Sequence, residues 1–174
     1  MQKHHKYSIA GYDPNDPYSF RTPTVKDGKW IWQLVKDTGV LDVNSPYSYL
    51  LWADQFSETS IVVEDHGKVV GFISGFIQPK APDTLFIWQV AVDESARGQG
   101  LASRMLHAIL QRPVCRIVQY LEATVTPTNI PSTKLFKGLA RDLQTECAVS
   151  EGYTAGHFPG GEHEAEELFR IGPF

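Results

Sequence analysis

The hydrophobic pattern over the first sixty residues predicts one short strand and two helices. The strand covers 20–23. The first helix places four side chains on one face at helical spacing: Ile31, Leu34, Val35 and Thr38. Asp27 is placed to cap its start, and Gly39 to end it. A second short helix is predicted around 49–56.

From residue 60 onward, strand-like runs outnumber helical ones. Two β-branched runs at 60–64 and 69–77 flank a turn at His66-Gly67, which predicts a β-hairpin. The order β-α-α-β-β-β-α-β-α-β-β indicates one α/β domain. The remaining elements are predicted as strands at 84–92, 117–125, near Cys147 and at 167–171, and as helices at 100–111 and 131–141.

Composition narrows the class of protein. The 174 residues suffice for one domain, predicted at 18–174 behind a flexible polar tail at 1–17. A net charge of −4 argues against nucleic-acid binding, which favours a basic surface. No apolar run predicts a membrane span and no signal peptide is visible, so we expect a cytoplasmic protein. Cys115 and Cys147 are isolated, without metal-ligand spacing, as in a reduced cytosolic protein.

The most specific pattern lies between the strand at 84–92 and the helix at 100–111. It reads Arg97-Gly98-Gln99-Gly100-Leu101-Ala102-Ser103, after a strand that ends in Val90-Ala91-Val92. Gly98 and Gly100 remove side chains where a ligand must approach the backbone closely. The free N–H groups at the start of the following helix attract an anion, and the helix dipole adds to that attraction. We therefore expect a pyrophosphate site here.

Two other phosphate-binding patterns are excluded. The dinucleotide fingerprint needs G-x-G-x-x-G, and its third Gly is absent. A P-loop needs Lys-Ser or Lys-Thr after its last Gly, where Leu101-Ala102 stands. The remaining pattern, R-x-x-G-x-A after Val-Ala-Val, closely resembles the acetyl-CoA segment of the GNAT superfamily of acyl-CoA-dependent N-acyltransferases.

This resemblance implies the α/β GNAT fold, a mixed, mostly antiparallel sheet flanked by helices and splayed between its fourth and fifth strands. The predicted element order over about 18–172 agrees with it. It also implies acetyl-CoA as co-substrate and no metal. Backbone N–H groups near Val90 and Val92 would pair with pantetheine and polarise the thioester oxygen. The residues expected at the cofactor are Val90, Ala91, Val92, Arg97, Gly98, Gln99, Gly100, Leu101, Ala102 and Ser103.

The segment from Asn129 onward resembles a second GNAT segment, N-x-x-A-x-x-L-Y. Asn129 is expected to hydrogen-bond the pantetheine arm or the backbone near it, with a helix cap as the alternative. Ser132 is the small residue that lets the helix lie against the cofactor. Phe136 stands where many members have a Tyr that protonates the departing thiolate. Because Phe136 has no proton to give, solvent is the expected source.

Three segments are expected to wall the acceptor pocket: the loop between the first two helices, the fourth strand and the last strand. They contribute Asp42 and Tyr47, then Trp88 and Gln89, and finally 166–170. Carboxylates, a phenol and an indole suit a small cationic amine, since the indole adds a π face for an ammonium. The alternative is a turn aspartate, core aromatics and a solvated strand.

Beyond these segments the chain resembles a narrower family, the L-2,4-diaminobutyrate acetyltransferases of ectoine biosynthesis. The resemblance implies acetyl transfer to the γ-amino group of diaminobutyrate, by direct attack in a ternary complex, for bacterial osmoprotection. It also implies a cytoplasmic homodimer. It rests on Phe20-Arg21-Thr22-Pro23, Gly28, Trp30, Asp42-Val43-Asn44-Ser45, Tyr47, Ile87-Trp88-Gln89-Val90-Ala91-Val92, Thr126-Pro127-Thr128-Asn129 and Gly161-Glu162-His163-Glu164-Ala165-Glu166-Glu167-Leu168-Phe169-Arg170-Ile171.

The attacking amine must be neutral, yet an ammonium with an ordinary pKa of about 10 is mostly charged at neutral pH. A carboxylate or an ordered water must therefore accept its proton. Glu167 is the predicted acceptor because it shares a strand face with Phe169 and Ile171, whereas a slip of one residue would give the role to Glu166. The amine would be held and oriented by Asp42, Tyr47 and Trp88.

The sequence leaves alternatives for the group that binds the substrate carboxylate and for the function of the chain. Arg21, Arg170 and backbone N–H groups are alternatives for binding the substrate carboxylate. His157 and His163 lie in a Gly-rich loop and are interpreted as solvated. The alternative functions are a GNAT enzyme for another small amine (a polyamine, an aminoglycoside or an amino acid) and a non-catalytic acyl-CoA-binding regulator.

Overall fold

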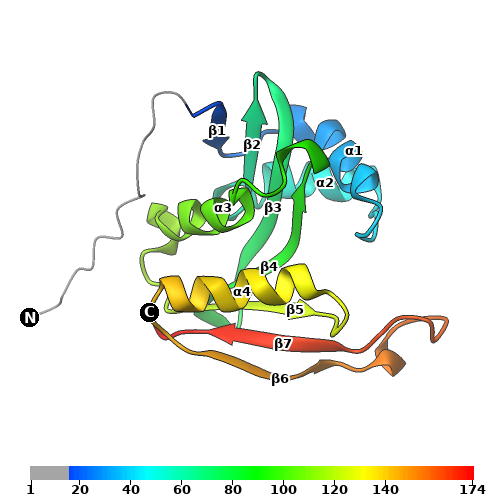
Figure 1. The fold of residues 1–174 in the computed structure, drawn as a ribbon, viewed down its shortest axis with the longest axis vertical. Coiled ribbons are helices and arrows are strands. Elements are labelled where there is room, and N and C mark those ends of the chain that lie inside the picture. Colours follow the sequence, from blue (N-terminus) through cyan, green and yellow to red (C-terminus); the bar gives the residue numbers. More distant parts are fainter. Residues whose placement is uncertain (1–15) are drawn as a thin grey trace, which may run out of the picture.

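One seven-stranded sheet runs through the computed structural model, which describes residues 16–174 (Figure 1). The strand order is β1-β2-β3-β4-β5-β7-β6, and only the neighbours β4 and β5 are parallel within this range. This mixed sheet confirms the predicted fold class, while most of the predicted tail at 1–17 lies outside the described residues. The strands are β1 (Tyr18–Arg21), β2 (Ile61–Asp65), β3 (Lys68–Gln78), β4 (Ala81–Val92), β5 (Tyr120–Val125), β6 (Cys147–Tyr153) and β7 (Glu166–Ile171).

Four α-helices occur within residues 16–174: α1 (Gly28–Thr38), α2 (Pro46–Asp54), α3 (Leu101–Leu110) and α4 (Ile130–Asp142). As predicted, α1 ends at Gly39, whose φ of 66° is left-handed. The second helix begins at Pro46, earlier than predicted, because proline fits the first turn of a helix. The strand predicted from 117 begins only at Tyr120, since a 3-10 turn at Pro113–Cys115 and the residues after it form the connection.

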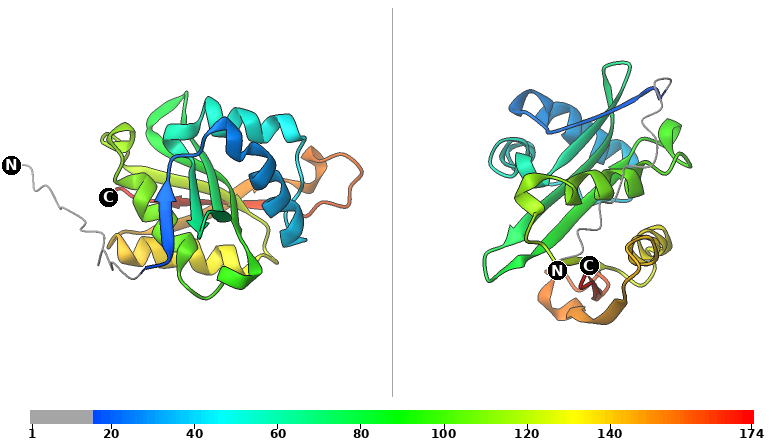
Figure 2. Two further views of the ribbon diagram at one scale, coloured as in Figure 1. Left: turned by 90° about the horizontal axis from the view of Figure 1, so that it is seen from above. Right: turned by 90° about the vertical axis from the view of Figure 1, so that its left-hand side faces the viewer.

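The helices lie on both faces of the sheet, as the two views in Figure 2 show. α3 and α4 pack on one face around fully buried side chains that include Met105, Leu106 and Phe169. α1 and α2 pack on the other face around Ile31 and Tyr49. Burying one such apolar side chain contributes about 1.5–3 kcal/mol. The two cores therefore fix both helix pairs against the sheet.

The parallel strands β4 and β5 separate along their length. Their pairing ends at Ile87 and Ala123, but β4 extends to Val92 and β5 to Val125. Backbone groups beyond the last pair are available to a ligand inserted between the strands. This opening confirms the splay predicted between the fourth and fifth strands. Within residues 16–174, no helix combines the length and apolar character needed to cross a membrane.

Candidate active site

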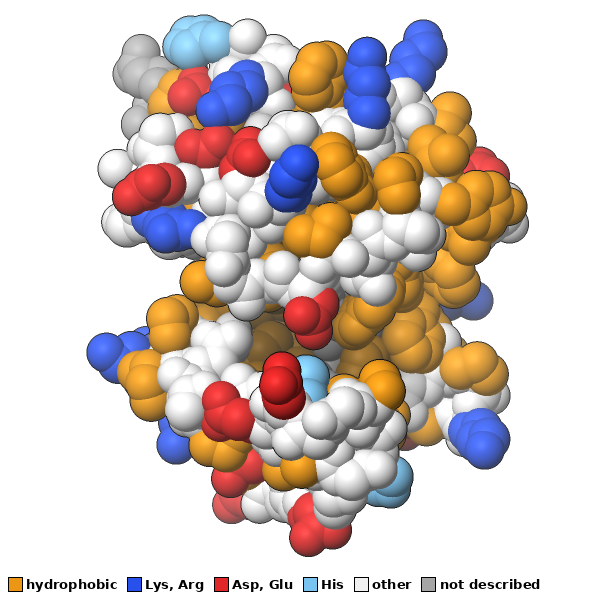
Figure 3. Space-filling model, turned by 90° about the vertical axis from the view of Figure 1, so that its right-hand side faces the viewer, with side chains coloured by type: hydrophobic (Ala, Val, Ile, Leu, Met, Phe, Trp, Pro, Cys, Tyr) orange, Lys and Arg blue, Asp and Glu red, His pale blue; other side chains and the backbone are white. Residues whose placement is uncertain are grey.

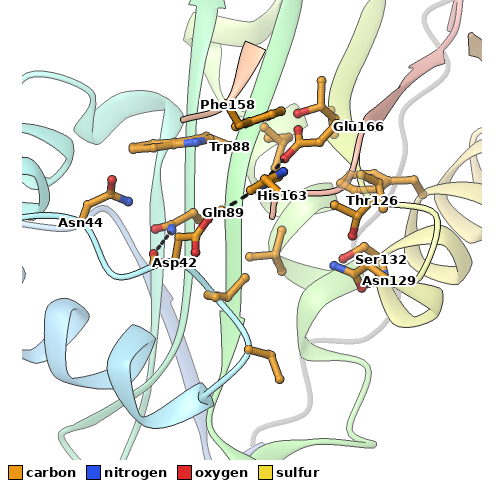
Figure 4. Close-up of a pocket in the computed structure, with 18 residues that line it drawn as sticks. Asp42, Asn44, Trp88, Gln89, Thr126, Asn129, Ser132, Phe158, His163 and Glu166 are labelled. Atoms are coloured by element: carbon orange, nitrogen blue, oxygen red, sulfur yellow. Dashed lines mark hydrogen bonds and ion pairs between the residues drawn. The ribbon is translucent and has the colours of Figure 1, made fainter. Parts of the chain in front are cut away.

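A cavity of about 470 Å³ occupies the opening between β4 and β5. Figure 3 shows this side of the molecule hollowed between an upper and a lower part, with acidic side chains and a histidine beside the hollow. The lining comes from β4, β5, α4, the α1–α2 loop and the β6–β7 loop (Figure 4). Segments far apart in the sequence therefore meet at one place.

The glycine turn leads into the N-terminus of α3. Gly98 and Gly100 have φ angles of 78° and 68°, in the left-handed region that glycine adopts without strain. Gly100 is the N-cap of α3, and the first N–H groups of a helix have no carbonyl partner within it. These groups and the helix dipole suit the pyrophosphate of a coenzyme A molecule.

A second cavity, of about 360 Å³, adjoins the first on the side of this turn. Val90, Asn129 and Ser132 line both cavities, so the two spaces form one continuous cleft. The predicted cofactor residues that line the second cavity are Val90, Val92, Arg97, Ala102, Asn129 and Ser132.

The other residues predicted around the glycine turn lie outside both linings. Ala91 and Leu101 are buried, each in one of the two cores. Ser103 is half-buried on α3, and the turn 98–100 is exposed. Any contact of Ala91 and Leu101 with a cofactor would have to come from their backbone groups.

Asn129 and Phe136 line the α4 side of the first cavity. The side-chain oxygen of Asn129 accepts a hydrogen bond from the Ser132 N–H at 3.1 Å and thereby caps α4, which is the alternative considered for it. Phe136 is 3% exposed and packs on Phe169, with ring centroids 6.3 Å apart. An apolar ring therefore occupies the position where the resemblance to the GNAT segment would place a tyrosine hydroxyl.

The α1–α2 loop brings Asp42 and Asn44 to the opposite wall. The Gln89 side-chain amide donates to the backbone carbonyl of Asp42 at 2.9 Å. The buried Tyr49 hydroxyl donates to Gln89 Oε1 at 3.4 Å and accepts from the Asn44 N–H at 3.2 Å. Tyr49 and Gln89 therefore hold this loop in place. The sequence pattern does not distinguish Tyr49 from an ordinary core aromatic.

The two aromatic residues predicted at the acceptor pocket differ in position. Trp88 lines the cavity and packs on Trp52 of α2, with ring centroids 5.1 Å apart. Tyr47 is 67% exposed and lies outside the lining. The geometry therefore supports an acceptor-site role for Trp88 and gives no support to one for Tyr47.

At the start of β7, Glu166 lines the cavity and Glu167 does not. Alternate residues of a strand face opposite sides of the sheet. Phe169 packs on α4, so Glu167 lies on the α4 side, whereas Leu168 lines a cavity on the other face together with Thr124. Thr124 also lines the first cavity. Glu167 therefore shares a strand face with Phe169, as predicted, but the residue that lines the cavity is Glu166, the alternative considered for the same role.

The β6–β7 loop adds a histidine to the acceptor side. His163 lines the cavity with its ring stacked on Phe158 at a centroid distance of 3.7 Å. Its Nε2 lies 3.9 Å from Asp42 Oδ2 and 3.9 Å from Glu166 Oε1. The interpretation of both loop histidines as solvated therefore holds for the exposed His157, whereas His163 lies in the cavity wall with 28% of its side chain exposed.

Neither arginine considered for the substrate carboxylate reaches the cavity. Arg21 donates to Asp27 at 2.7 Å and to Glu64 at 2.5 Å, and these hydrogen bonds raise its pKa. Arg170 is paired with Glu122. Among the described residues, no Lys or Arg lines the first cavity, so the carboxylates of Asp42 and Glu166 give it a negative character. Among residues 16–174, no three His, Cys, Asp or Glu side chains are grouped to hold a metal ion.

Known proteins are similar to this chain in both sequence and fold. A family model described as the acetyltransferase (GNAT) family matches residues 29–140. The L-2,4-diaminobutyric acid acetyltransferase of Virgibacillus pantothenticus is 58% identical over 151 residues, which are 87% of this chain and 95% of that protein. The protein of the same name from Marinococcus halophilus is 52% identical over 159 residues, 91% of this chain and 92% of its own.

A solved structure is similar over nearly the whole domain. It is the diaminobutyrate acetyltransferase EctA from Paenibacillus lautus, in complex with its substrate L-2,4-diaminobutyric acid and coenzyme A. The TM-score is 0.87 at 46% sequence identity, covering 90% of this chain and 95% of that chain.

Proposed function

This chain belongs to the acetyltransferase (GNAT) family, and we propose that it transfers the acetyl group of acetyl-CoA to the γ-amino group of L-2,4-diaminobutyrate. It is an acetyl-CoA-dependent N-acetyltransferase. The reaction proceeds by direct attack in a ternary complex and supplies ectoine biosynthesis. The family, the relatives named diaminobutyrate acetyltransferase and the chemistry of the cavity support this proposal together.

The observation that carries the substrate assignment is the pair of carboxylates on opposite walls of one cavity. Asp42 and Glu166 each lie 3.9 Å from the same atom, His163 Nε2, so both can contact one small molecule. Diaminobutyrate carries two ammonium groups on a short chain, and charge-assisted hydrogen bonds to carboxylates are the strong ones. Because the described lining holds no Lys or Arg, it selects for positive charge.

The cofactor end of the cleft binds acetyl-CoA through backbone groups. The first N–H groups of α3, reached through Gly98 and Gly100, hold the pyrophosphate. The pantetheine arm follows β4 past Val90 and lies against Asn129 and Ser132, which line both cavities. Backbone N–H groups on the β5 side of β4, beyond the last β4–β5 pair at Ile87 and Ala123, polarise the thioester oxygen.

The neutral amine attacks the thioester carbonyl carbon from the acceptor side. A C–N bond forms, the C–S bond breaks, and the sulfur leaves with the electron pair as a thiolate. Phe136 lines this part of the cavity and has no proton to donate. Water therefore carries the remaining proton of the acylated nitrogen to the thiolate.

Thiol release from acetyl-CoA tests this function. Diaminobutyrate, ornithine, lysine and spermidine are compared as acceptors, and NMR of the product locates the acetyl group. We expect the highest kcat/KM for diaminobutyrate, with acetyl on its γ-nitrogen. Preference for another amine would reassign the acceptor pocket within the same family. Tight acetyl-CoA binding without release for any amine would instead indicate a regulator without turnover.

We also propose that the chain works as a homodimer in the cytoplasm, which rests on its resemblance to the diaminobutyrate acetyltransferases. Light scattering of the purified protein tests the first statement, and a single species with the mass of one chain would refute it. Fractionation of the source cells tests the second.

A further inference from the structure

The amine must lose a proton before it attacks, and side-chain types differ in how well they take one. An ammonium ordinarily has a pKa of about 10, an imidazole about 6.5 and a carboxyl group about 4. A proton acceptor works best when its pKa lies near the operating pH. An imidazole is therefore better matched to this task than a carboxylate.

The ring of His163 is held in one tautomer. Its Nδ1 lies 2.6 Å from the backbone carbonyl oxygen of Glu164. A carbonyl oxygen can only accept, so Nδ1 carries the hydrogen and donates it. In the neutral ring, Nε2 then has the free lone pair.

The surrounding contacts direct this lone pair into the cavity. The His163 ring stacks on Phe158 with an interplanar angle of 11°. The Thr128 hydroxyl donates to the Glu164 carboxylate at 2.5 Å and so connects this loop to the segment between β5 and α4. Figure 4 shows the His163 ring between Glu166 and the Asp42 side of the cavity.

The space around Nε2 suits an ammonium group. Nε2 is 3.9 Å from both Asp42 Oδ2 and Glu166 Oε1, which exceeds hydrogen-bond distance and leaves room for a small donor among the three. Among the described residues that line the first cavity, Asp42 and Glu166 are the charged groups that face the His163 ring. β4, β5 and α4 contribute uncharged side chains there, among them Gln89, Ala123 and Ser132. An imidazolium formed at this position is attracted mainly by Glu166, whose side chain is 20% exposed, and only weakly by Asp42, whose side chain is 92% exposed.

We propose that His163 takes the proton from the γ-ammonium of the bound substrate, while Asp42 and Glu166 hold the amine. This inference rests on the proposed function. One N–H bond of the ammonium breaks and its proton moves to Nε2. The freed lone pair forms the C–N bond, and the C–S pair leaves on sulfur. The His163 side chain is 28% exposed, so Nε2 returns its proton to water.

The pH dependence of kcat at saturating acetyl-CoA and diaminobutyrate tests this role. In the wild type, kcat falls toward acid pH because a proton fills Nε2. In His163→Gln, kcat at neutral pH falls about 100-fold and the acid limb is lost, since the loss of a general base costs about 10²–10⁴. His157→Gln changes an exposed histidine of the same loop and keeps the wild-type profile. Added imidazole restores turnover to His163→Ala.

The outcomes separate this inference from the proposed function. If His163→Gln keeps the wild-type acid limb, or raises only the KM for diaminobutyrate, His163 does not accept the proton. Nitrogen-15 NMR of the wild-type ring gives an answer that is independent of how the variants fold. A neutral ring protonated on Nε2 would overturn the inference. A wild type that does not acetylate diaminobutyrate would refute the function instead.

Discussion

The two ends of the cleft are built in different ways. The cofactor end uses mainly one continuous segment, in which the end of β4 runs through the glycine turn into α3. It offers backbone N–H groups, which do not depend on particular side chains. The acceptor end joins Asp42, Trp88 and the pair His163 and Glu166 from three separate segments. It depends on charges and on the contacts that hold its loops.

This difference predicts that the kinetic constants of the two substrates can be changed separately. A change in the glycine turn affects acetyl-CoA, and a change in the assembled wall affects the amine. The comparison would break down if one substitution at either end altered both KM values to the same degree.

The largest effect is expected from Asp42→Asn combined with Glu166→Gln. Glu166→Gln removes a largely buried charged acceptor, worth about 1.5–3 kcal/mol, and Asp42→Asn removes an exposed one, worth about 0.2–1 kcal/mol, so kcat/KM for diaminobutyrate falls about a hundredfold. The KM for acetyl-CoA stays unchanged because the glycine turn is untouched. Steady-state kinetics with each substrate varied in turn measures both constants.

The matched control is Glu167→Gln, which changes the neighbouring residue on the opposite face of β7. It keeps a kcat/KM close to that of the wild type. A loss in Glu167→Gln as large as in the double variant would return the acceptor role to Glu167 and contradict the orientation seen here.

Gly100→Ala tests the cofactor end. An L-residue in the left-handed region costs about 1–2 kcal/mol, so the turn shifts and the KM for acetyl-CoA rises about tenfold. Gly67→Ala is the control, since Gly67 has a φ of 82° and, like Gly100, open space around an added methyl group. Both variants lower Tm, but only Gly100→Ala raises this KM. If the KM for acetyl-CoA were equal in the two variants, the substitution at Gly100 would report only backbone strain and not a role in binding the cofactor.

A smaller effect is expected from Tyr49→Phe, which keeps the buried ring and removes the hydroxyl between Asn44 and Gln89. The loop that carries Asp42 loosens, and the KM for diaminobutyrate rises about fivefold, equivalent to roughly one hydrogen bond. Tyr47→Phe removes an exposed hydroxyl from the same helix and leaves this KM unchanged. The reverse result would support the substrate-orienting role predicted for Tyr47.

The same contrast explains how much could be predicted from the sequence. α1 has a complete helical period between Asp27 and Gly39, and the glycine turn is contiguous, so both can be recognised locally. The choice between Glu166 and Glu167 cannot be made from such a local pattern. Strand alternation predicts two faces, but not which face opens into the cavity, since that depends on where β4 and β5 separate.

Residues that act through distant partners had no local pattern. The hydroxyl of Tyr49 meets Gln89, which is 40 positions away in the sequence. His163 lies in a Gly-rich loop without periodicity, and its partner Asp42 belongs to the other wall of the cavity. Such pairs become visible only when the loops are placed in three dimensions.

The smallest effect concerns Asp93, at the junction between β4 and the glycine turn. Its carboxylate accepts from the Lys68 ammonium at 2.7 Å and from the Ser95 N–H at 3.0 Å. The hydrogen bond from Lys68, followed by those from Ser95, lowers the pKa of Asp93 to about 2. A carboxyl whose pKa is lower in the folded state stabilises that state above its unfolded pKa of about 3.9. That stabilisation is lost as pH falls through the folded value.

Asp93→Asn therefore lowers Tm by about 1–3 °C at neutral pH, since one partly exposed ion pair contributes little. Asparagine still accepts from the Ser95 N–H, so the variant isolates the charge. The difference from the wild type shrinks below about pH 4 and disappears near about pH 2. Thermal unfolding across this range measures it, with the exposed Asp54→Asn as control. A difference that stays constant with pH would mean that the shape of the turn, rather than the charge on Asp93, anchors the cofactor end.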